Sequence, residues 1–154
     1  LFAVVRNPYS RIISEWNYLP QMDRNNATAL NLWVQEHLRE MLNNPNEPYF
    51  AVDGHFLQQH LFFHRNYSTI LLRQERLKDD FDCLMAMYGL NLTLPERRLN
   101  PRRDDARLTA RNFTEATVQM IQTVYAQDFY KFGYPVRYGD MARWRGGRQH
   151  LDIL

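Results

Sequence analysis

The first residues of the chain combine two signals that strongly restrict its fold. Residues 1–5 read Leu-Phe-Ala-Val-Val, a continuous apolar run typical of strands that are covered on both faces of a parallel sheet. Asn7 and Pro8 follow, and these are favourable N-cap and first residues of a helix. The order predicts a strand, a tight turn at Arg6 and then a helix that Pro20 ends.

The same alternation of strand and helix continues along the chain. A second apolar strand is expected at 68–72, and helices are expected at 29–42, 77–88 and 113–132. Residues 55–63 keep neither a helical nor a strand period and stay unassigned. The pattern predicts an α/β domain of three layers, with a central parallel sheet flanked by helices. We expect this domain to cover residues 1–136 and the tail 137–154 to be flexible.

Composition narrows the class of protein further. The chain has 154 residues and 45% hydrophobic residues, which suits one globular domain. Nineteen Lys and Arg against 17 Asp and Glu give a net charge of +2, so nothing indicates a nucleic-acid partner. The single cysteine excludes a disulfide framework and a Cys-rich zinc module. His55, His60 and His64 lack a well-placed acidic partner, so no metal is predicted.

Four Asn-x-Ser/Thr sequons begin at Asn26, Asn66, Asn91 and Asn112. Chance would give about one, so the sequons favour a compartment of the secretory pathway. Two of them have another interpretation, because Asn112 could cap a helix and Asn66 could border a strand. No apolar run reaches the length of a membrane span. Since the chain opens inside a strand at Leu1, we expect an upstream part to be missing.

The turn after the first strand is the first place to look for a binding site. In open α/β sheets, ligands bind at the carboxyl ends of the strands. The helix that starts at Pro8 is expected to offer unpaired amides, and Arg6 a guanidinium, to a phosphate or sulfate. Ser14 falls on the same helix face as Asn7, almost two turns further on. The alternative is a turn that only caps the helix, with Arg6 paired to a carboxylate.

Four segments carry a resemblance to a known family. Residues 6–14, Arg-Asn-Pro-Tyr-Ser-Arg-Ile-Ile-Ser, resemble the 3′-phosphate-binding motif of sulfotransferases. Residues 55–59, His-Phe-Leu-Gln-Gln, are similar to the His-Trp-x-Pro-Gln segment of the Golgi carbohydrate sulfotransferases. The strand and Glu-containing turn at 68–75 and the Tyr-x-x-Asp-Phe pattern at 125–134 match that group in the same order.

The resemblance implies both a fold, which is like that of the P-loop NTPases, and a reaction, which is sulfuryl transfer. A sulfuryl group would pass from 3′-phosphoadenosine 5′-phosphosulfate to a carbohydrate hydroxyl, without a metal and without nucleic acid. Arg6 and Ser14 would hold the 3′-phosphate of the donor, and His55 and Gln59 would contact the acceptor, a glycan or glycoprotein. The full-length enzyme would lie in the Golgi lumen as a single-pass membrane protein, attached through an N-terminal anchor that this chain lacks.

The chain also departs from the family pattern. The family's loop for the 5′-phosphosulfate should precede Arg6, and the catalytic base usually lies between these two elements. We therefore assign no catalytic residue and expect this C-terminal portion to be inactive alone. Glu75 could orient a group of the site at the end of its strand, but a carboxylate there more often caps the following helix or pairs with Arg76. Asp128 is predicted to tie the last helix to the body.

Two other functions remain open from the sequence. The first is a noncatalytic module that binds anionic glycan or nucleic acid through the basic loop 97–111. The second is a nucleotide kinase, whose sheet is similar. The Gly-x-x-x-x-Gly-Lys-Ser/Thr loop of such kinases does not occur in the sequence.

Overall fold

The computed structural model describes residues 1–45, 54–63, 70–95, 108–144 and 152–153. The strands are β1 (Phe2–Val5), β2 (Ile70–Arg73) and β3 (Asp152–Ile153). The helices are α1 (Pro8–Tyr18), α2 (Ala27–Asn43), α3 (Leu77–Met87), α4 (Glu115–Val124) and α5 (Ala126–Phe132). Short 3₁₀ helices are η2 (Gln59–Phe62), η3 (Gln74–Arg76), η4 (Ala110–Asn112) and η5 (Tyr138–Ala142). The predicted α/β class is confirmed.

The sheet has the order β1-β2-β3. β1 and β2 are parallel, with Phe2 beside Ile70 and Val5 beside Arg73, and β3 is antiparallel to β2. The central strand β2 is buried throughout. β1 differs, because Phe2 is 51% and Val4 47% exposed. The expectation that residues 1–5 are covered on both faces is therefore wrong, since no described element covers these two side chains.

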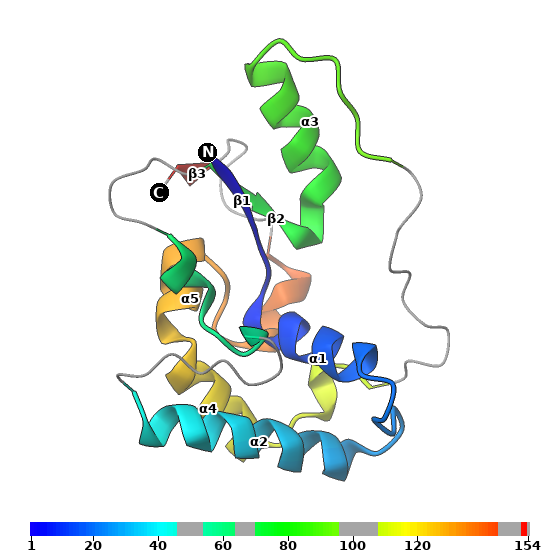
Figure 1. Cartoon of the computed structure of the whole chain (residues 1–154), viewed down its shortest axis with the longest axis vertical. Helices are drawn as coiled ribbons and strands as arrows, with labels where there is room; N and C mark the ends of the chain where they lie inside the picture. The colour runs from blue at the N-terminus through cyan, green and yellow to red at the C-terminus, as the bar shows by residue number, and fades with distance from the viewer. Residues whose placement is uncertain (46–53, 64–69, 96–107, 145–151, 154) are drawn as a thin grey trace.

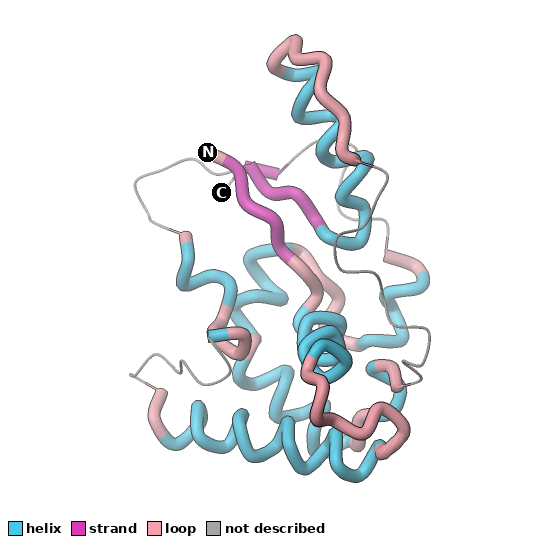
Figure 2. The backbone as a smooth tube through the Cα atoms, turned by 45° about the vertical axis from the view of Figure 1, so that its right-hand side comes forward, coloured by secondary structure: helices cyan, strands magenta, loops and turns pink. Residues whose placement is uncertain are grey.

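The helices form two groups around the sheet. Figure 1 shows α1 crossing the molecule just beyond the carboxyl end of β1, with α2 and α4 side by side further away. α3 starts close to the carboxyl end of β2 and packs along β2, apart from the other helices, and Figure 2 shows the same separation from a second direction. The body of the domain therefore lies on the side of the sheet where β1 and β2 end.

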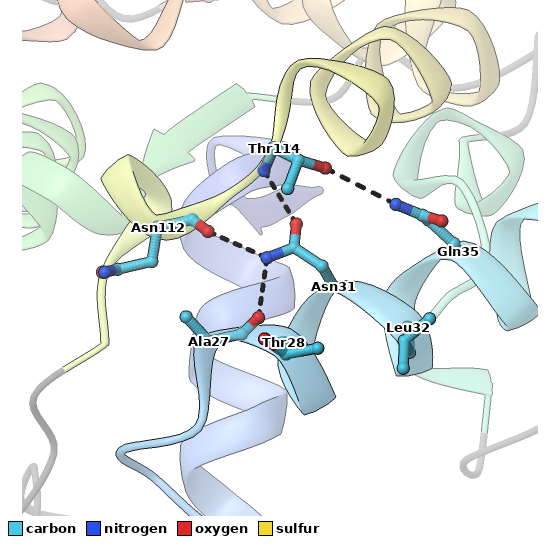
Figure 3. Close-up of a pocket in the computed structure, with 7 residues that line it drawn as sticks. All are labelled: Ala27, Thr28, Asn31, Leu32, Gln35, Asn112 and Thr114. Atoms are coloured by element: carbon cyan, nitrogen blue, oxygen red, sulfur yellow. Dashed lines mark hydrogen bonds between the residues drawn. The ribbon is translucent and has the colours of Figure 1, made fainter.

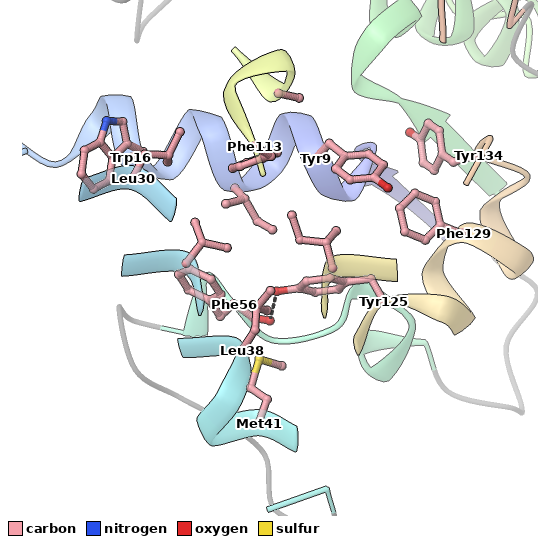
Figure 4. Packing of buried hydrophobic residues seen from close by; sticks show 14 of the residues in the cluster. Tyr9, Trp16, Leu30, Leu38, Met41, Phe56, Phe113, Tyr125, Phe129 and Tyr134 are labelled. Carbon is pink, nitrogen blue, oxygen red and sulfur yellow. Dashed lines mark hydrogen bonds between the residues drawn. The ribbon is translucent and has the colours of Figure 1, made fainter. Parts of the chain in front are cut away.

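Two apolar clusters follow from this arrangement. The main cluster joins α1, α2, α4 and α5 around large buried side chains, among them Tyr9, Trp16, Leu38, Tyr125 and Phe132 (Figure 4). The small cluster lies under α3 and consists of Ile70, Leu72, Leu84 and Met85. Alternate residues of β2 serve the two clusters, since Leu71 belongs to the main one. This is the two-residue period of a strand that is covered on both faces.

The helix predicted over 113–132 is two helices, so that prediction is wrong. Tyr125 lies between α4 and α5 with φ −99° and ψ 20°. Its buried hydroxyl donates a hydrogen bond of 2.7 Å to the carbonyl of Phe56. The break places Tyr125 where its hydroxyl holds residues 55–63, the stretch that the sequence left unassigned and that contains η2.

The last part of the chain contributes contacts to the domain. Trp144 stacks near Tyr134 with ring centroids 5.0 Å apart, and its Nε1 donates to the carbonyl of Gly133 at 2.9 Å. Residues 145–151, like the predicted strand start at 68–69 and most of the basic loop, lie outside the described residues. Flexibility of the tail stays a prediction. No helix in the described ranges combines the length and apolar character needed to cross a membrane.

Candidate functional site

The turn between β1 and α1 forms as the sequence predicts. Asn7 is fully buried and is the N-cap of α1, with Pro8 as the first helical residue. Its Oδ1 accepts hydrogen bonds from the amides of Tyr9 at 3.0 Å and Ser10 at 3.4 Å. Two of the N–H groups that a helix start leaves without partners are thus satisfied locally.

The remaining amides of the turn are also satisfied. The Arg6 amide donates to Oε1 of Gln59 at 2.9 Å, and the Asn7 amide donates to Oε1 of Glu75 at 2.9 Å. Pro8 has no N–H group. The expectation that this helix offers unpaired amides to an anion is therefore wrong. Recognition of a phosphate at this turn must come from side chains.

Arg6 is the side chain best placed for that role. Its guanidinium is partly buried, and burial lowers its pKa, while the Glu75 carboxylate opposes that shift. Within the described ranges, neither a hydrogen bond nor an ion pair engages this guanidinium. The predicted alternative, in which Arg6 is tied to a carboxylate, is thus not what the described residues show. Arg6 keeps its N–H donors available for a ligand.

Ser14 lies on the second turn of α1 and is partly buried. Ser10, one turn earlier on the same helix, is also partly buried. Hydroxyl groups on this face can add hydrogen bonds to an anion that a guanidinium attracts. That Arg6 and Ser14 bind one phosphate stays a prediction.

Glu75 takes neither of the two roles that the sequence favoured and instead organises the ends of the strands, the alternative that the sequence also allowed. It neither caps α3, which starts without a side-chain cap, nor pairs with Arg76, whose Nε donates to Asp80. Its carboxylate instead accepts from the Asn7 amide and, at 2.8 Å, from the Tyr134 hydroxyl. The parallel register, which aligns the ends of β1 and β2, is the signal that could have located it.

Tyr134, two residues after the end of α5, joins Glu75 in connecting the ends of the two parallel strands. Burial, and then the neighbouring Glu75 carboxylate, raise the pKa of Tyr134, so its hydroxyl stays protonated and donating. The same hydroxyl lies 3.2 Å from the carbonyl of Val5. One tyrosine therefore connects the last helix to the ends of both parallel strands.

Gln59 uses both atoms of its amide on the backbone of Arg6. Besides accepting from the Arg6 amide, it donates from Nε2 to the Arg6 carbonyl at 2.7 Å. Gln59 is 8% exposed. The structure thus gives it a positioning role at the turn, and its contact with an acceptor stays a prediction.

His55 is held by α1. Its Nδ1 lies 2.5 Å from Oε2 of Glu15, and the imidazole is 47% exposed while the Glu15 side chain is 11% exposed. One turn earlier on α1, Nη1 of Arg11 donates to the carbonyl of Leu57 at 2.5 Å. The predicted donor-binding helix and the predicted acceptor-binding segment are therefore in direct contact. Contact of His55 with an acceptor stays a prediction.

Asp128 ties α5 to the segment that contains Gln59 and His60, in line with the sequence prediction that it ties the last helix to the body. Its fully buried carboxylate accepts from the amides of Gln59 and His60 at 2.8 and 2.9 Å, and its Oδ1 lies 2.7 Å from Nδ1 of His60. Three polar contacts compensate the burial of this charge. Through its Nδ1, His60 has a structural role in holding this segment against α5.

A cavity of about 260 Å³ lies beside β1 and next to the turn. It is lined by Ala3, Val4, Val5, Arg11, Gln59, Phe62 and Phe63. In the described parts of the chain, no group of three or more His, Cys, Asp or Glu residues is arranged to hold a metal ion.

The fold and the turn define an α/β domain with a cation at the carboxyl edge of parallel strands. A sequence model of the Sulfotransferase family matches residues 1–135. The chain belongs to the sulfotransferase family. Searches of curated proteins and of solved structures returned no match.

Proposed function

We propose that this chain supplies the 3′-phosphate-binding part of an enzyme that moves a sulfuryl group from 3′-phosphoadenosine 5′-phosphosulfate to a hydroxyl of a carbohydrate. The observation that carries the proposal is the Arg6 guanidinium, a partly buried cation without a hydrogen-bond partner among the described residues. It lies at the carboxyl end of a parallel strand, in a domain of the sulfotransferase family.

The chemistry resembles phosphoryl transfer. The acceptor oxygen bonds to sulfur while the bond between sulfur and the 5′-phosphate oxygen breaks, and negative charge grows on the leaving nucleotide. Alignment and charge stabilisation then do most of the catalysis. Arg6 and Ser14 would act at the remote 3′-phosphate, where binding energy fixes the donor without touching the reacting bond.

The acceptor and the compartment follow from the resemblance. A glycan or glycoprotein would lie against the segment that His55 and Gln59 belong to, with His55 as the more exposed of the two. The sequons support a glycoprotein of the secretory pathway, and by the resemblance it would lie in the Golgi lumen, anchored in the membrane by an N-terminal segment. The runner-up function, a noncatalytic binding module, has no supporting observation, because most of its basic loop lies outside the described residues.

Nucleotide affinity tests the donor site. Calorimetry should show that the full-length protein binds 3′-phosphoadenosine 5′-phosphate more tightly than adenosine 5′-phosphate, which lacks the 3′-phosphate. Arg6→Ala should weaken binding of the first nucleotide by about 1.5–3 kcal/mol, because a charge-assisted pair is lost. Arg39→Ala, at an exposed arginine of α2, is the matched control.

Equal affinity for the two nucleotides would contradict the proposal. The acceptor is tested separately, by transfer of radioactive sulfate from the labelled donor. Chemically desulfated chondroitin and heparin should be sulfated, and a tyrosine-containing peptide should not. Sulfation of the peptide alone would replace the carbohydrate by tyrosine as acceptor.

A further inference from the structure

Three of the four sequons lie in the described residues, and their asparagines share an unusual property. Asn26, Asn91 and Asn112 are all exposed. Among the described residues, none of the three donates a hydrogen bond through Nδ2, the nitrogen that N-glycosylation modifies. An exposed asparagine whose Nδ2 donates no hydrogen bond can be glycosylated at that nitrogen without losing a hydrogen bond of the fold.

Two of these asparagines have structural roles that a glycan would preserve. Oδ1 of Asn26 accepts from the Ala29 amide at 2.9 Å as the N-cap of α2. Oδ1 of Asn112 accepts from the Thr109 amide at 2.8 Å in the capping box of η4. A glycosidic bond to Nδ2 leaves Oδ1 as an acceptor, so capping and glycosylation are compatible.

Three asparagines outside the sequons use this nitrogen in contacts within the fold. Nδ2 of Asn31 donates to the carbonyls of Ala27 and Asn112, at 2.7 and 2.9 Å. Nδ2 of Asn44 donates to Glu40, and Nδ2 of Asn7 donates to Sδ of Met141. A glycan on any of these three would cost a contact, whereas at the three sequon asparagines of the described residues it would cost none.

The surroundings leave room for a sugar. Asn112, with Thr28 and Thr114 of two sequons, borders a cavity of about 290 Å³ between α2 and the start of α4 (Figure 3). Asn91 follows α3, where Met87, Tyr88, Leu90 and Leu92 are each at least half exposed. A hydrophilic glycan at Asn91 would shield this apolar surface from other molecules.

We infer that Asn26, Asn91 and Asn112 each carry an N-linked oligosaccharide, and that the one at Asn91 covers the exposed apolar end of α3. In the modification, Nδ2 loses a proton and bonds to C1 of the first sugar. The bond from C1 to the pyrophosphate of a lipid-linked oligosaccharide donor breaks, and the lipid pyrophosphate leaves. The inference rests on the proposed lumenal location, not on sulfuryl transfer.

Peptide mass spectrometry tests the inference on full-length protein that is produced through the secretory pathway of a eukaryotic cell line. Treatment with peptide N-glycosidase in heavy-oxygen water should convert all three asparagines to labelled aspartates. Asn26→Asp, Asn91→Asp and Asn112→Asp should each remove one step of gel mobility, since aspartate keeps the capping oxygen but lacks the amide. Asn25→Asp, at an exposed neighbour outside a sequon, should keep all three steps.

Asn91→Asp should also increase the aggregated fraction in size-exclusion chromatography, whereas the two cap variants should not. Unmodified peptides at these positions from folded, secreted protein would overturn the assignment. Full occupancy with unchanged aggregation of Asn91→Asp would overturn the shielding role. Nucleotide binding is measured on the same samples, so a failure of the proposed transferase function is recognised separately.

Discussion

The two parallel strands end side by side, but the turns that follow them are built differently. After β1, the buried side chain of Asn7 caps α1. The backbone amides of residues 6, 7, 9 and 10 all donate to side-chain oxygens. After β2, α3 starts without a side-chain cap, and buried Asp80 accepts from the Arg73 amide and from Nε of Arg76. The second turn thus pairs the Arg76 guanidinium with Asp80, while among the described residues the Arg6 guanidinium of the first turn has no hydrogen bond or ion pair.

The largest loss of stability is expected when the carboxylate that organises the turn after β2 is removed. Asp80→Ala should lower the free energy of unfolding by about 3 kcal/mol, because a buried amide and a guanidinium lose their acceptor. Urea denaturation measures this. Asp82→Ala is the matched control on α3, since its pair with Lys78 is exposed and screened by solvent and should contribute little to stability. Equal losses in the two variants would show that Asp80 does not organise the turn.

Breaking the cap of the first turn should cost less. Asn7→Ala should lower the free energy of unfolding by about 1–2 kcal/mol, because two amides of α1 lose their acceptor. Asn7→Asp keeps an acceptor oxygen and should cost less than Asn7→Ala in the same thermal or urea titration. The reverse order would mean that the amide's contact with Met141 matters more than the cap.

The buried Tyr134 hydroxyl, which bonds to Glu75 between the two turns, should make the free energy of unfolding depend on pH in the alkaline range. The pKa of Tyr134 is raised in the folded state, so above pH of about 10 the unfolded chain loses a proton that the folded chain keeps. Stability should therefore fall as pH rises past that value. Tyr134→Phe should reduce this loss by about 1 kcal/mol in urea titrations at pH 9 and 11. Tyr130→Phe, at a residue 84% exposed, should leave the pH dependence unchanged.

The smallest effect is expected from the charge that faces Arg6. Glu75→Gln keeps an acceptor for the Asn7 amide but removes a negative charge beside the proposed phosphate site. Binding of 3′-phosphoadenosine 5′-phosphate should tighten by about threefold, and the gain should shrink at high salt. Weaker binding of Glu75→Gln in calorimetry would show that the ionised carboxylate is needed to hold the turn.

The sequence was sufficient wherever a structure depends on neighbours along the chain. Asn7 and Pro8 start α1, and the helix ends before Pro20, because caps and breakers act within one turn. The parallel pairing of the two apolar strands joins distant residues, yet it was predictable from composition, since continuous apolar runs are typical of strands in a parallel sheet. β1 is the exception, as Phe2 and Val4 are exposed.

The rest depends on contacts between distant residues. Gln59 reaches the Arg6 backbone across 53 positions, and Glu75 reaches Asn7 across 68. No local pattern shows that these two side chains occupy the amides that a helix start normally leaves for an anion. The break at Tyr125 has the same origin, because its hydroxyl bonds to Phe56, 69 positions away.

The long separation between β1 and β2 also sets an order of assembly. Closing a loop of this size costs entropy before any strand contact repays it, whereas α1 and α2 can form from nearby residues. Pairing of the strands should therefore come late in folding, and the Glu75 contact to the Asn7 amide with it. A nascent polypeptide that has emerged only as far as α2 would have the arginine but not the carboxylate and tyrosine that shape its surroundings. The proposed nucleotide site would accordingly be completed late, together with cooperative folding of the whole domain.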